Sequence, residues 1–215
     1  MSAFEVLENP VRDTIIRTFL EKKVIINYNE IKQLVGQDTS RPDYHLNILV
    51  ESGLLERTRG RGNYELKKEM IQPLRKKYDI LVPICLLGGL IDINLYANIL
   101  DGLKEEVSII PKKYFILTSP NIKEKFEKEA EKHNLTQKYG VEPLFELFEY
   151  DSELKGDISK IRTQAEMVIK KNIFEYEIIC DLTGGTKLVT IALSKLSEDY
   201  NLRKILFTGE HIKWL

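Results

Sequence analysis

The stretch Ile178-Ile179-Cys180-Asp181-Leu182-Thr183-Gly184-Gly185-Thr186-Lys187 joins an apolar run to two glycines and a lysine. An apolar run that ends in an aspartate is typical of a buried strand, and the residues from Lys187 onward have the spacing of an amphipathic helix. The glycines permit unusual backbone angles and leave amides unscreened, and the helix directs its positive N-terminus to the same place. The stretch therefore predicts a strand, an anion-binding loop and a helix, with phosphate as the expected occupant.

The sequence on both sides of this stretch repeats the alternation of apolar runs and amphipathic segments. This pattern predicts an α/β fold class, with a Rossmann-like, mainly parallel sheet over residues 79–215. Ligands bind such sheets at the carboxyl ends of the strands. The expected strands are 80–87, 114–118, 145–150, 176–181 and 204–208, and the expected helices are 92–103, 121–133, 157–171 and 187–199.

Three of the expected strands end in residues suited to an anion. Neither GxxxxGK[ST] nor GxGxxG occurs, which disfavours simple mononucleotide hydrolysis and dinucleotide redox chemistry. The glycines could instead serve close packing without a ligand. The candidate ligand-binding residues are Gly88, Gly89, Thr118, Ser119, Asn121, Asp181, Thr183, Gly184, Gly185, Thr186 and Lys187.

Residues 1–66 predict a different domain, a winged helix-turn-helix. Asn9 and Pro10 suit the first positions of a helix, and Asn27 suits the cap of a second helix whose apolar face includes Leu34. Ser40 suits the cap of a third helix, expected over 41–52. The sequence of residues 54–66, with a turn at 59–63, predicts a β-hairpin, the wing.

The exposed side of the third helix would enter the major groove, and a basic hairpin suits the DNA backbone or minor groove. Residues 1–78 hold 14 Lys and Arg against 11 Asp and Glu, a weak excess in the same direction. A basic hairpin can also be only a solvated turn, and the domain could serve protein interaction or dimerisation. The candidate DNA-binding residues are Ser40, Arg41, Tyr44, His45, Asn47, Arg57, Arg59 and Arg61.

Residues 67–78 predict a linking helix, which could transmit the state of the second domain or simply connect the two.

The composition excludes several classes of protein and of site. No apolar run is long enough to cross a bilayer and no signal sequence is recognisable, so we expect a cytoplasmic protein without a membrane partner. Cys85 and Cys180 are expected to be core thiols, and the spacing of the cysteines and histidines predicts no metal site and no cofactor.

Two resemblances to known families follow from these motifs. The D-x-T-G-G-T-K of 181–187, with support from Leu87-Gly88-Gly89, resembles the signature of the CARF domain, the CRISPR-associated Rossmann fold. The first domain resembles the winged helix of ArsR-type regulators. Familiar CARF regulators carry the two domains in the opposite order, and the ArsR-type metal ligands are missing here. The winged-helix resemblance rests on Ser40, His45-Leu46, Leu49, Gly53-Leu54, Gly60, Gly62 and Tyr64-x-Leu66.

The CARF resemblance implies a homodimer that binds a cyclic oligoadenylate, either cyclic tetra- or hexaadenylate, across its two-fold axis. Together the resemblances imply a DNA-binding transcription regulator linked to type III CRISPR-Cas antiviral defence, with double-stranded DNA as a partner and without catalytic residues. The alternative is a ring nuclease that cleaves the ligand, with Lys187, Thr186 and Ser119 as candidate catalytic residues. A regulator of another nucleotide is a third hypothesis. Glu153-Leu154-Lys155 imitates part of a nuclease motif and is better explained as a solvated charge run.

Overall fold

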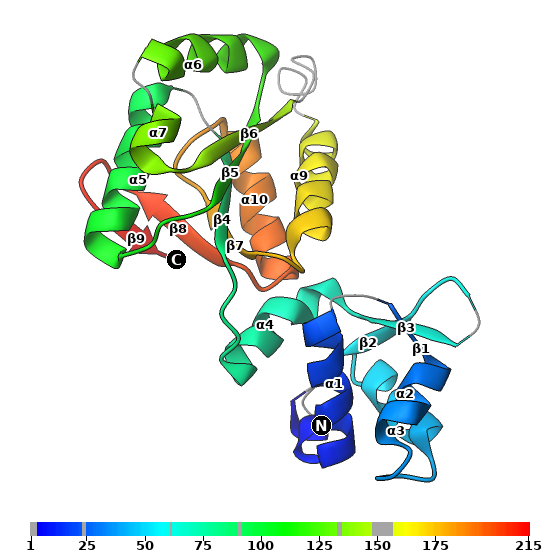
Figure 1. The fold of residues 1–215 in the computed structure, drawn as a ribbon. Helices are drawn as coiled ribbons and strands as arrows, with labels where there is room; N and C mark the ends of the chain where they lie inside the picture. Colours follow the sequence, from blue (N-terminus) through cyan, green and yellow to red (C-terminus); the bar gives the residue numbers. More distant parts are fainter. Residues whose placement is uncertain (1–3, 23–24, 61, 90–91, 133–134, 148–156) are drawn as a thin grey trace. The chain divides into compact units, whose positions relative to one another are not determined.

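The computed structural model describes the chain except residues 1–3, 23–24, 61, 90–91, 133–134 and 148–156 (Figure 1). The chain divides into two compact units, Met1–Ile80 and Leu81–Leu215. Both units bury apolar side chains of their own. No helix within the described ranges has the length and apolar character needed to cross a membrane.

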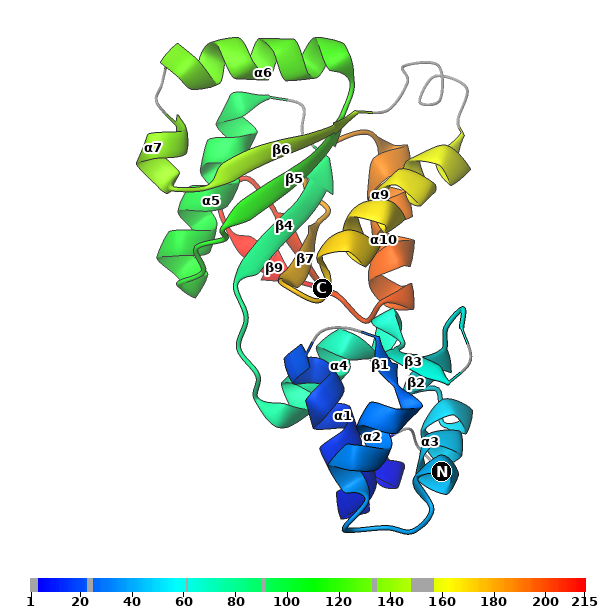
Figure 2. The same cartoon turned by 45° about the vertical axis from the view of Figure 1, so that its right-hand side comes forward.

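The first unit consists of helices and a three-stranded antiparallel sheet with the strand order β1-β3-β2 (Figure 2). The β2–β3 hairpin was expected, whereas β1 was not. The elements are a 3-10 helix Glu5–Glu8, α1 Pro10–Lys22, β1 Ile26–Asn27, α2 Tyr28–Val35, α3 Pro42–Glu51, β2 Leu55–Arg57, β3 Asn63–Leu66 and α4 Lys68–Tyr78.

The helix starts of this unit follow the capping residues, with one correction. Asn9 Oδ1 accepts a hydrogen bond from the Arg12 amide at 3.3 Å, and the Asn27 side chain caps α2, as expected. Ser40 does not cap α3, because the N-cap position belongs to Arg41, without a side-chain cap bond. The Arg41 amide instead donates to Thr39 Oγ1 at 3.1 Å.

The apolar face of α2 is narrower than expected, and α4 packs within the first unit. Leu34 is 42% exposed, so the prediction that it lies on the apolar face that packs inward was wrong. The Tyr78 hydroxyl at the end of α4 donates to Asp13 Oδ1 at 2.7 Å, and the Arg17 guanidinium lies 4.1 Å from the centroid of the Tyr78 ring. These contacts attach the expected linking helix to α1.

The second unit is a mixed α/β domain with a six-stranded sheet in the order β6-β5-β4-β7-β8-β9. The strands from β6 to β8 are parallel and β9 is antiparallel, which gives the mainly parallel, Rossmann-like sheet that the sequence predicts. The strands are β4 Ile84–Gly89, β5 Lys113–Thr118, β6 Glu142–Leu147, β7 Glu177–Asp181, β8 Arg203–Phe207 and β9 Ile212–Trp214. The end of the strand expected at 145–150 lies outside the described residues.

Helices cover both faces of this sheet, with α5, α6 and α7 on one side and α9 and α10 on the other (Figures 1 and 2). Alternate strand residues therefore enter two cores, as the period of a strand requires. Leu86, Tyr114 and Ile179 contribute to the core on the side of α5. The helices are α5 Ile93–Val107, α6 Pro120–Lys132, α7 Leu135–Tyr139, α9 Ile158–Asn172 and α10 Lys187–Asp199.

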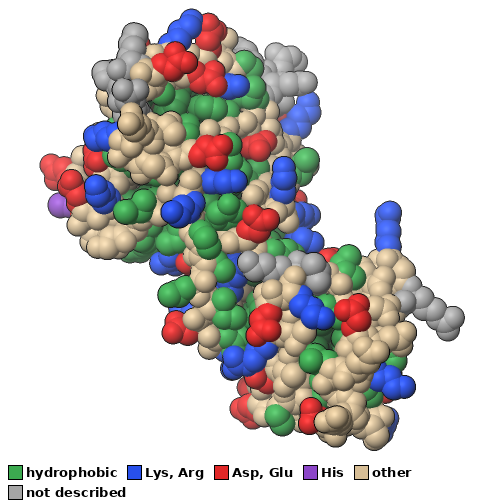
Figure 3. Space-filling model, viewed as in Figure 1, with side chains coloured by type: hydrophobic (Ala, Val, Ile, Leu, Met, Phe, Trp, Pro, Cys, Tyr) green, Lys and Arg blue, Asp and Glu red, His purple; other side chains and the backbone are tan. Residues whose placement is uncertain are grey.

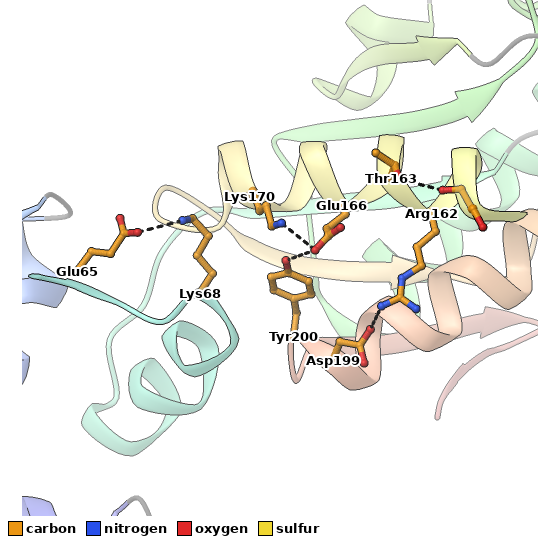
Figure 4. Close-up of polar contacts among 9 residues, drawn as sticks. Glu65, Lys68, Arg162, Thr163, Glu166, Lys170, Asp199 and Tyr200 are labelled. Atoms are coloured by element: carbon orange, nitrogen blue, oxygen red, sulfur yellow. Dashed lines mark hydrogen bonds and ion pairs between the residues drawn. The ribbon is translucent and has the colours of Figure 1, made fainter. Parts of the chain in front are cut away.

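Polar contacts join α9 to the C-terminal end of α10 (Figure 4). Arg162 pairs with Asp199 at 2.6 Å. Glu166 accepts a hydrogen bond from the Tyr200 hydroxyl at 2.7 Å and pairs with Lys170 at 2.9 Å. Because α10 begins directly after the glycine loop, these contacts hold the far end of the helix that carries the loop.

Candidate functional site at the glycine loops of the sheet

The two glycine pairs of the second unit meet where the chain changes its direction across the sheet. Strands β4 and β7 are neighbours, and the chain continues from β4 toward β5 on one side and from β7 toward β8 on the other. Open α/β sheets bind ligands in the crevice at such a switch point. Gly88 and Gly89 end β4, and Gly184 and Gly185 follow β7.

The glycines allow the two segments to touch backbone to backbone. A Cβ atom at Gly184 would collide with the carbonyl oxygen of Gly89, and a Cβ atom at Gly89 would lie 2.8 Å from Gly185 Cα. Gly185 also has a φ of +85°, which an L side chain rarely adopts. Close packing therefore accounts for Gly89 and Gly184, and the backbone angle accounts for Gly185.

The buried side chain of Asp181 holds the start of the glycine loop by hydrogen bonds. Asp181 is fully buried, and its Oδ1 accepts hydrogen bonds from the Thr183 amide at 2.9 Å and from the Thr183 hydroxyl. The Tyr114 hydroxyl donates to the other oxygen of Asp181, and the Phe207 amide donates to Thr183 Oγ1 at 2.8 Å. The end of β7 and the start of the loop are thus hydrogen-bonded to β5 through Tyr114 and to β8 through Phe207.

The buried environment of this network raises the pKa of both of its acidic groups, Asp181 and Tyr114. Burial raises the pKa of Asp181 above its ordinary value, and the hydrogen bonds from Thr183 and Tyr114 oppose this effect. Burial, and then the charge of Asp181, raises the pKa of Tyr114 well above its usual range. Tyr114 therefore remains protonated and able to donate its hydrogen bond at neutral pH.

The contact between Tyr114 and Asp181 explains why residue 88 is a glycine. Strand β4 lies between the strands of these two residues, so the tyrosine side chain must pass over β4. A Cβ atom at Gly88 would lie 2.8 Å from the Tyr114 hydroxyl oxygen and 3.0 Å from Asp181 Cβ. Tyr114 was not among the site residues expected from the sequence, although a tyrosine in an apolar strand signals that its hydroxyl needs a buried partner.

The rest of the expected ligand-binding set divides by exposure. Lys187, Thr186 and Asn121 are exposed, whereas Thr118 and Ser119 are 2% and 7% exposed. Thr186 is the N-cap of α10, and its side chain makes no cap hydrogen bond. The first amides of a helix have no acceptor within the helix, so the start of α10 combines these amides with the Thr186 hydroxyl and the Lys187 ammonium group. This arrangement can bind an anion.

The first unit presents most of the expected DNA-binding residues on its surface. Ser40, Arg41, Tyr44 and Asn47 are exposed on or beside α3, and Arg57 and Arg59 are exposed on the hairpin. Arg61 lies outside the described residues. In Figure 3, basic and acidic side chains are interspersed over the visible face of the unit. DNA binding through this face would therefore depend on individual side chains and not on a uniformly basic patch.

His45 does not join this exposed set, which corrects the expectation that it contacts DNA. It is 9% exposed, and its Nδ1 has no hydrogen-bond partner within the described part of the chain. Burial lowers the pKa of His45, the nearby charge of Arg12 lowers it further, and Asp43 acts in the opposite direction. The side chain is a buried, neutral imidazole at neutral pH.

We expect the first unit to lose stability as the pH falls below about 6.5, the ordinary pKa of histidine. The unfolded chain binds a proton on His45 at a higher pH than the folded chain, so protonation favours unfolding until the pH falls below the folded pKa. His45→Phe should flatten this part of the pH profile of the unfolding free energy. Denaturation between pH 7.5 and 5.5 measures it, and His211→Phe at an exposed position is the control. An unchanged slope in His45→Phe would contradict the assignment.

Among the described residues, neither a group of metal ligands nor a surface hollow marks a further site at the glycine loops. No group of three or more histidine, cysteine or acidic side chains suited to a metal occurs among the described residues. A hollow of about 900 Å³ lies against α6 and β6, and one of about 630 Å³ lies along α9. Neither hollow is lined by any residue expected to bind the ligand.

The strand order and the glycine contacts define the second unit as a Rossmann-like domain with a glycine-lined switch point.

No known family model and no curated protein sequence matches this chain. Several solved structures, including the following two, share a partial likeness with it. Csm6 of Enterococcus italicus, bound to cyclic hexa-2'-fluoro-hexa-dAMP, has 13% identity and a TM-score of 0.44 over 59% of this chain. Protein VC1899 of Vibrio cholerae has 13% identity and a TM-score of 0.46 over 61% of this chain. The matched part covers 33% of each of those longer chains.

Proposed function

We propose that this protein is a homodimeric transcription regulator that binds DNA through its first unit and a cyclic oligoadenylate through its second, a CARF domain. The observation that carries the proposal is the position of the D-x-T-G-G-T-K loop of 181–187. It lies beside Gly88 and Gly89 at the switch point of a parallel sheet, where such folds bind ligands. The regulator would act in type III CRISPR-Cas antiviral defence.

The chemistry of the loop supports a phosphate-containing ligand. Lys187 is exposed at the first position of α10 and supplies a positive charge next to the helix N-terminus. The buried bonds of Asp181 to Thr183 fix the backbone before these groups, so the amides are oriented without the ligand. Preorganised donors lose little entropy when an anion binds.

A cyclic oligoadenylate also suits a two-fold dimer. Its phosphates repeat around a ring, so two copies of one loop, related by a two-fold axis, contact equivalent phosphates on opposite sides. The same symmetry predicts a palindromic DNA site with two half-sites on one face of the duplex. Ligand and DNA must then affect each other's binding by the same factor.

Two exposed groups support a second candidate function, a ring nuclease. The Thr186 hydroxyl makes no cap hydrogen bond, and Lys187 is exposed beside it, so both could stabilise attack by a ribose hydroxyl on the adjacent phosphate. Ser119 is buried, which weakens the third candidate catalytic residue. In this hypothesis the first unit serves only for dimerisation or protein interaction.

Incubation of the full chain with cyclic tetra- and hexaadenylate, followed by chromatography, separates the two functions. Binding by calorimetry, without cleavage and with a ligand-dependent change in DNA affinity, supports the regulator. Multiple turnover without salt-sensitive DNA binding supports the nuclease. Binding of a different nucleotide in a calorimetric panel would leave the regulator with another ligand.

Lys187→Ala should weaken the binding of the cyclic oligoadenylate at least tenfold, because the variant loses a charge-assisted contact of about 1.5–3 kcal/mol at the start of α10. Calorimetry measures the change. Lys195→Ala is the matched control, since Lys195 is an exposed lysine on the same helix, far from its N-terminus. Equal affinities for the two variants would remove the loop as the binding site.

Arg59→Ala should weaken DNA binding to a similar extent on all sequences and reduce the slope of log affinity against log salt by about 1, the value expected for one lost phosphate contact. A salt titration by fluorescence anisotropy measures both effects. Lys125→Ala removes the same charge from an exposed position in the second unit and serves as the control. A slope equal to that of the control would exclude the hairpin from the DNA contact.

A further inference from the structure

A hydrogen bond joins the exposed face of α3 to the hairpin. The Arg57 guanidinium, at the end of β2, donates from Nη2 to Asn47 Oδ1 at 2.7 Å, and both side chains are exposed. Neither residue contributes to the buried core of the first unit, so packing does not account for the pair. We therefore consider what this hydrogen bond does for the chemistry of the exposed Asn47 amide.

The chemistry of arginine fixes the orientation of the Asn47 amide. A guanidinium group only donates hydrogen bonds, so the amide oxygen and not the amide nitrogen must face Arg57. The oxygen retains a second lone pair, and both hydrogens of the nitrogen remain to donate. Asn47 thus presents an acceptor beside a donor, and the bond from Arg57 favours this orientation of its amide.

An acceptor beside a donor is complementary to one base edge in the major groove. Adenine offers the N6 amino donor and the N7 acceptor, which an asparagine amide contacts in a bidentate manner. Guanine offers two acceptors, N7 and O6, and therefore leaves the amide oxygen without a donor. In this orientation the amide of Asn47 is complementary to adenine and not to guanine.

The position of Asn47 on α3 is consistent with a base contact. Leu46 and Leu49 are fully buried and define the side of the helix that faces the core. Asn47 is exposed, and Tyr44 and Glu51 are exposed at spacings of three and four residues from it, so they share one face of the helix. An exposed face of this helix is the part expected in the major groove.

We infer that Asn47 determines the sequence specificity of this protein by contacting an adenine in each DNA half-site, and that Arg57 is a positioning residue that orients its amide. The inference rests on the proposed DNA-binding function. Arg57 acts through Asn47, whereas Arg59 is expected to contact only phosphate. The two neighbouring arginines of the hairpin should consequently differ in their effect on sequence preference.

Selection of duplexes from a randomised library by the full chain, with and without cyclic tetra- or hexaadenylate, tests the inference. We expect the wild type to enrich an adenine at one position in each half-site. Asn47→Ala should reduce that preference about tenfold and leave the other positions unchanged. Arg57→Ala should reduce the preference at the same position, and the double variant should reduce it no further than Asn47→Ala.

Two further variants sharpen the test. Asn47→Asp replaces the donor with an acceptor while keeping the size of the side chain, so the preference at that position should change from adenine to cytosine. Arg59→Ala should weaken binding on all sequences without changing the preference. Circular dichroism and thermal denaturation verify that each variant is folded, which is expected for changes at exposed positions.

The outcomes separate this inference from the proposed function. An unchanged preference in Asn47→Ala, a preference for another base in the wild type, or an effect of Arg57→Ala that is uniform across sequences would overturn the inference. Absence of DNA binding by the wild type at low salt, with and without the cyclic oligoadenylates, would overturn the proposed function itself.

Discussion

Gly184→Ala is expected to lower the free energy of unfolding of the second unit by about 3 kcal/mol, the upper range for overpacking a rigid site. The added Cβ atom would collide with the carbonyl oxygen of Gly89. That oxygen belongs to the last residue of β4, which is paired with Leu117 of β5, so moving it away would disturb the end of the strand. Urea denaturation measures the loss through the fluorescence of Trp214, the single tryptophan of the chain, which lies in β9.

Gly140→Ala is the comparison variant for this prediction, because it adds a Cβ atom without a steric clash. Gly140 has a φ of +66°, and a Cβ atom there would meet nothing within 4 Å. The control therefore measures the backbone cost of a left-handed alanine alone, about 1 kcal/mol. If Gly184→Ala costs no more than Gly140→Ala, the two glycine segments do not pack as closely as the structure shows.

Asp181→Ala is expected to cost about 4 kcal/mol of stability and to abolish binding of the anion. The substitution removes the acceptor of the Tyr114 hydroxyl, the Thr183 amide and the Thr183 hydroxyl, all beneath the loop. Each buried polar group left without a partner costs about 1–3 kcal/mol. Denaturation and calorimetry with the cyclic oligoadenylates measure the two effects.

Tyr114→Phe is the milder variant of this network. It removes one donor to Asp181 and preserves the two bonds from Thr183, so about 2 kcal/mol is expected. Tyr139→Phe removes a hydroxyl that also bonds to a carboxylate, that of Asp101, at a half-buried position and should cost less than about 1 kcal/mol. Similar losses of unfolding free energy in the two variants would contradict a larger contribution from the buried bond of Tyr114.

The larger elements of the fold were predictable because they repeat a period over many residues. The alternation of apolar runs and amphipathic segments predicted five strands and four helices of the second unit near their observed positions. The short elements β1, β9 and α7, of two, three and five residues, were missed because so few residues show no period. The cap of α3 was misplaced by one residue, since Ser40 and Arg41 both precede Pro42.

The candidate site was predictable in its parts but not in its internal contacts. The rule for parallel sheets places the two glycine pairs at one edge of the sheet from the amino-acid sequence alone. The sequence left open whether the glycines serve a ligand or packing, and the structure shows that Gly89 and Gly184 pack against each other. The role of Tyr114 could not be predicted, because its partner depends on the order of the strands.

The bond between Tyr114 and Asp181 also has a consequence for the kinetics of folding. The two residues are 67 positions apart in the sequence, and β4 must lie between their strands before the bond can form. Contacts between residues this distant in sequence form slowly, because the chain must first close a large loop. We therefore expect the glycine loop of 181–187 to acquire its final shape late in folding, so that a chain still emerging from the ribosome lacks this loop geometry until its last strands have been added.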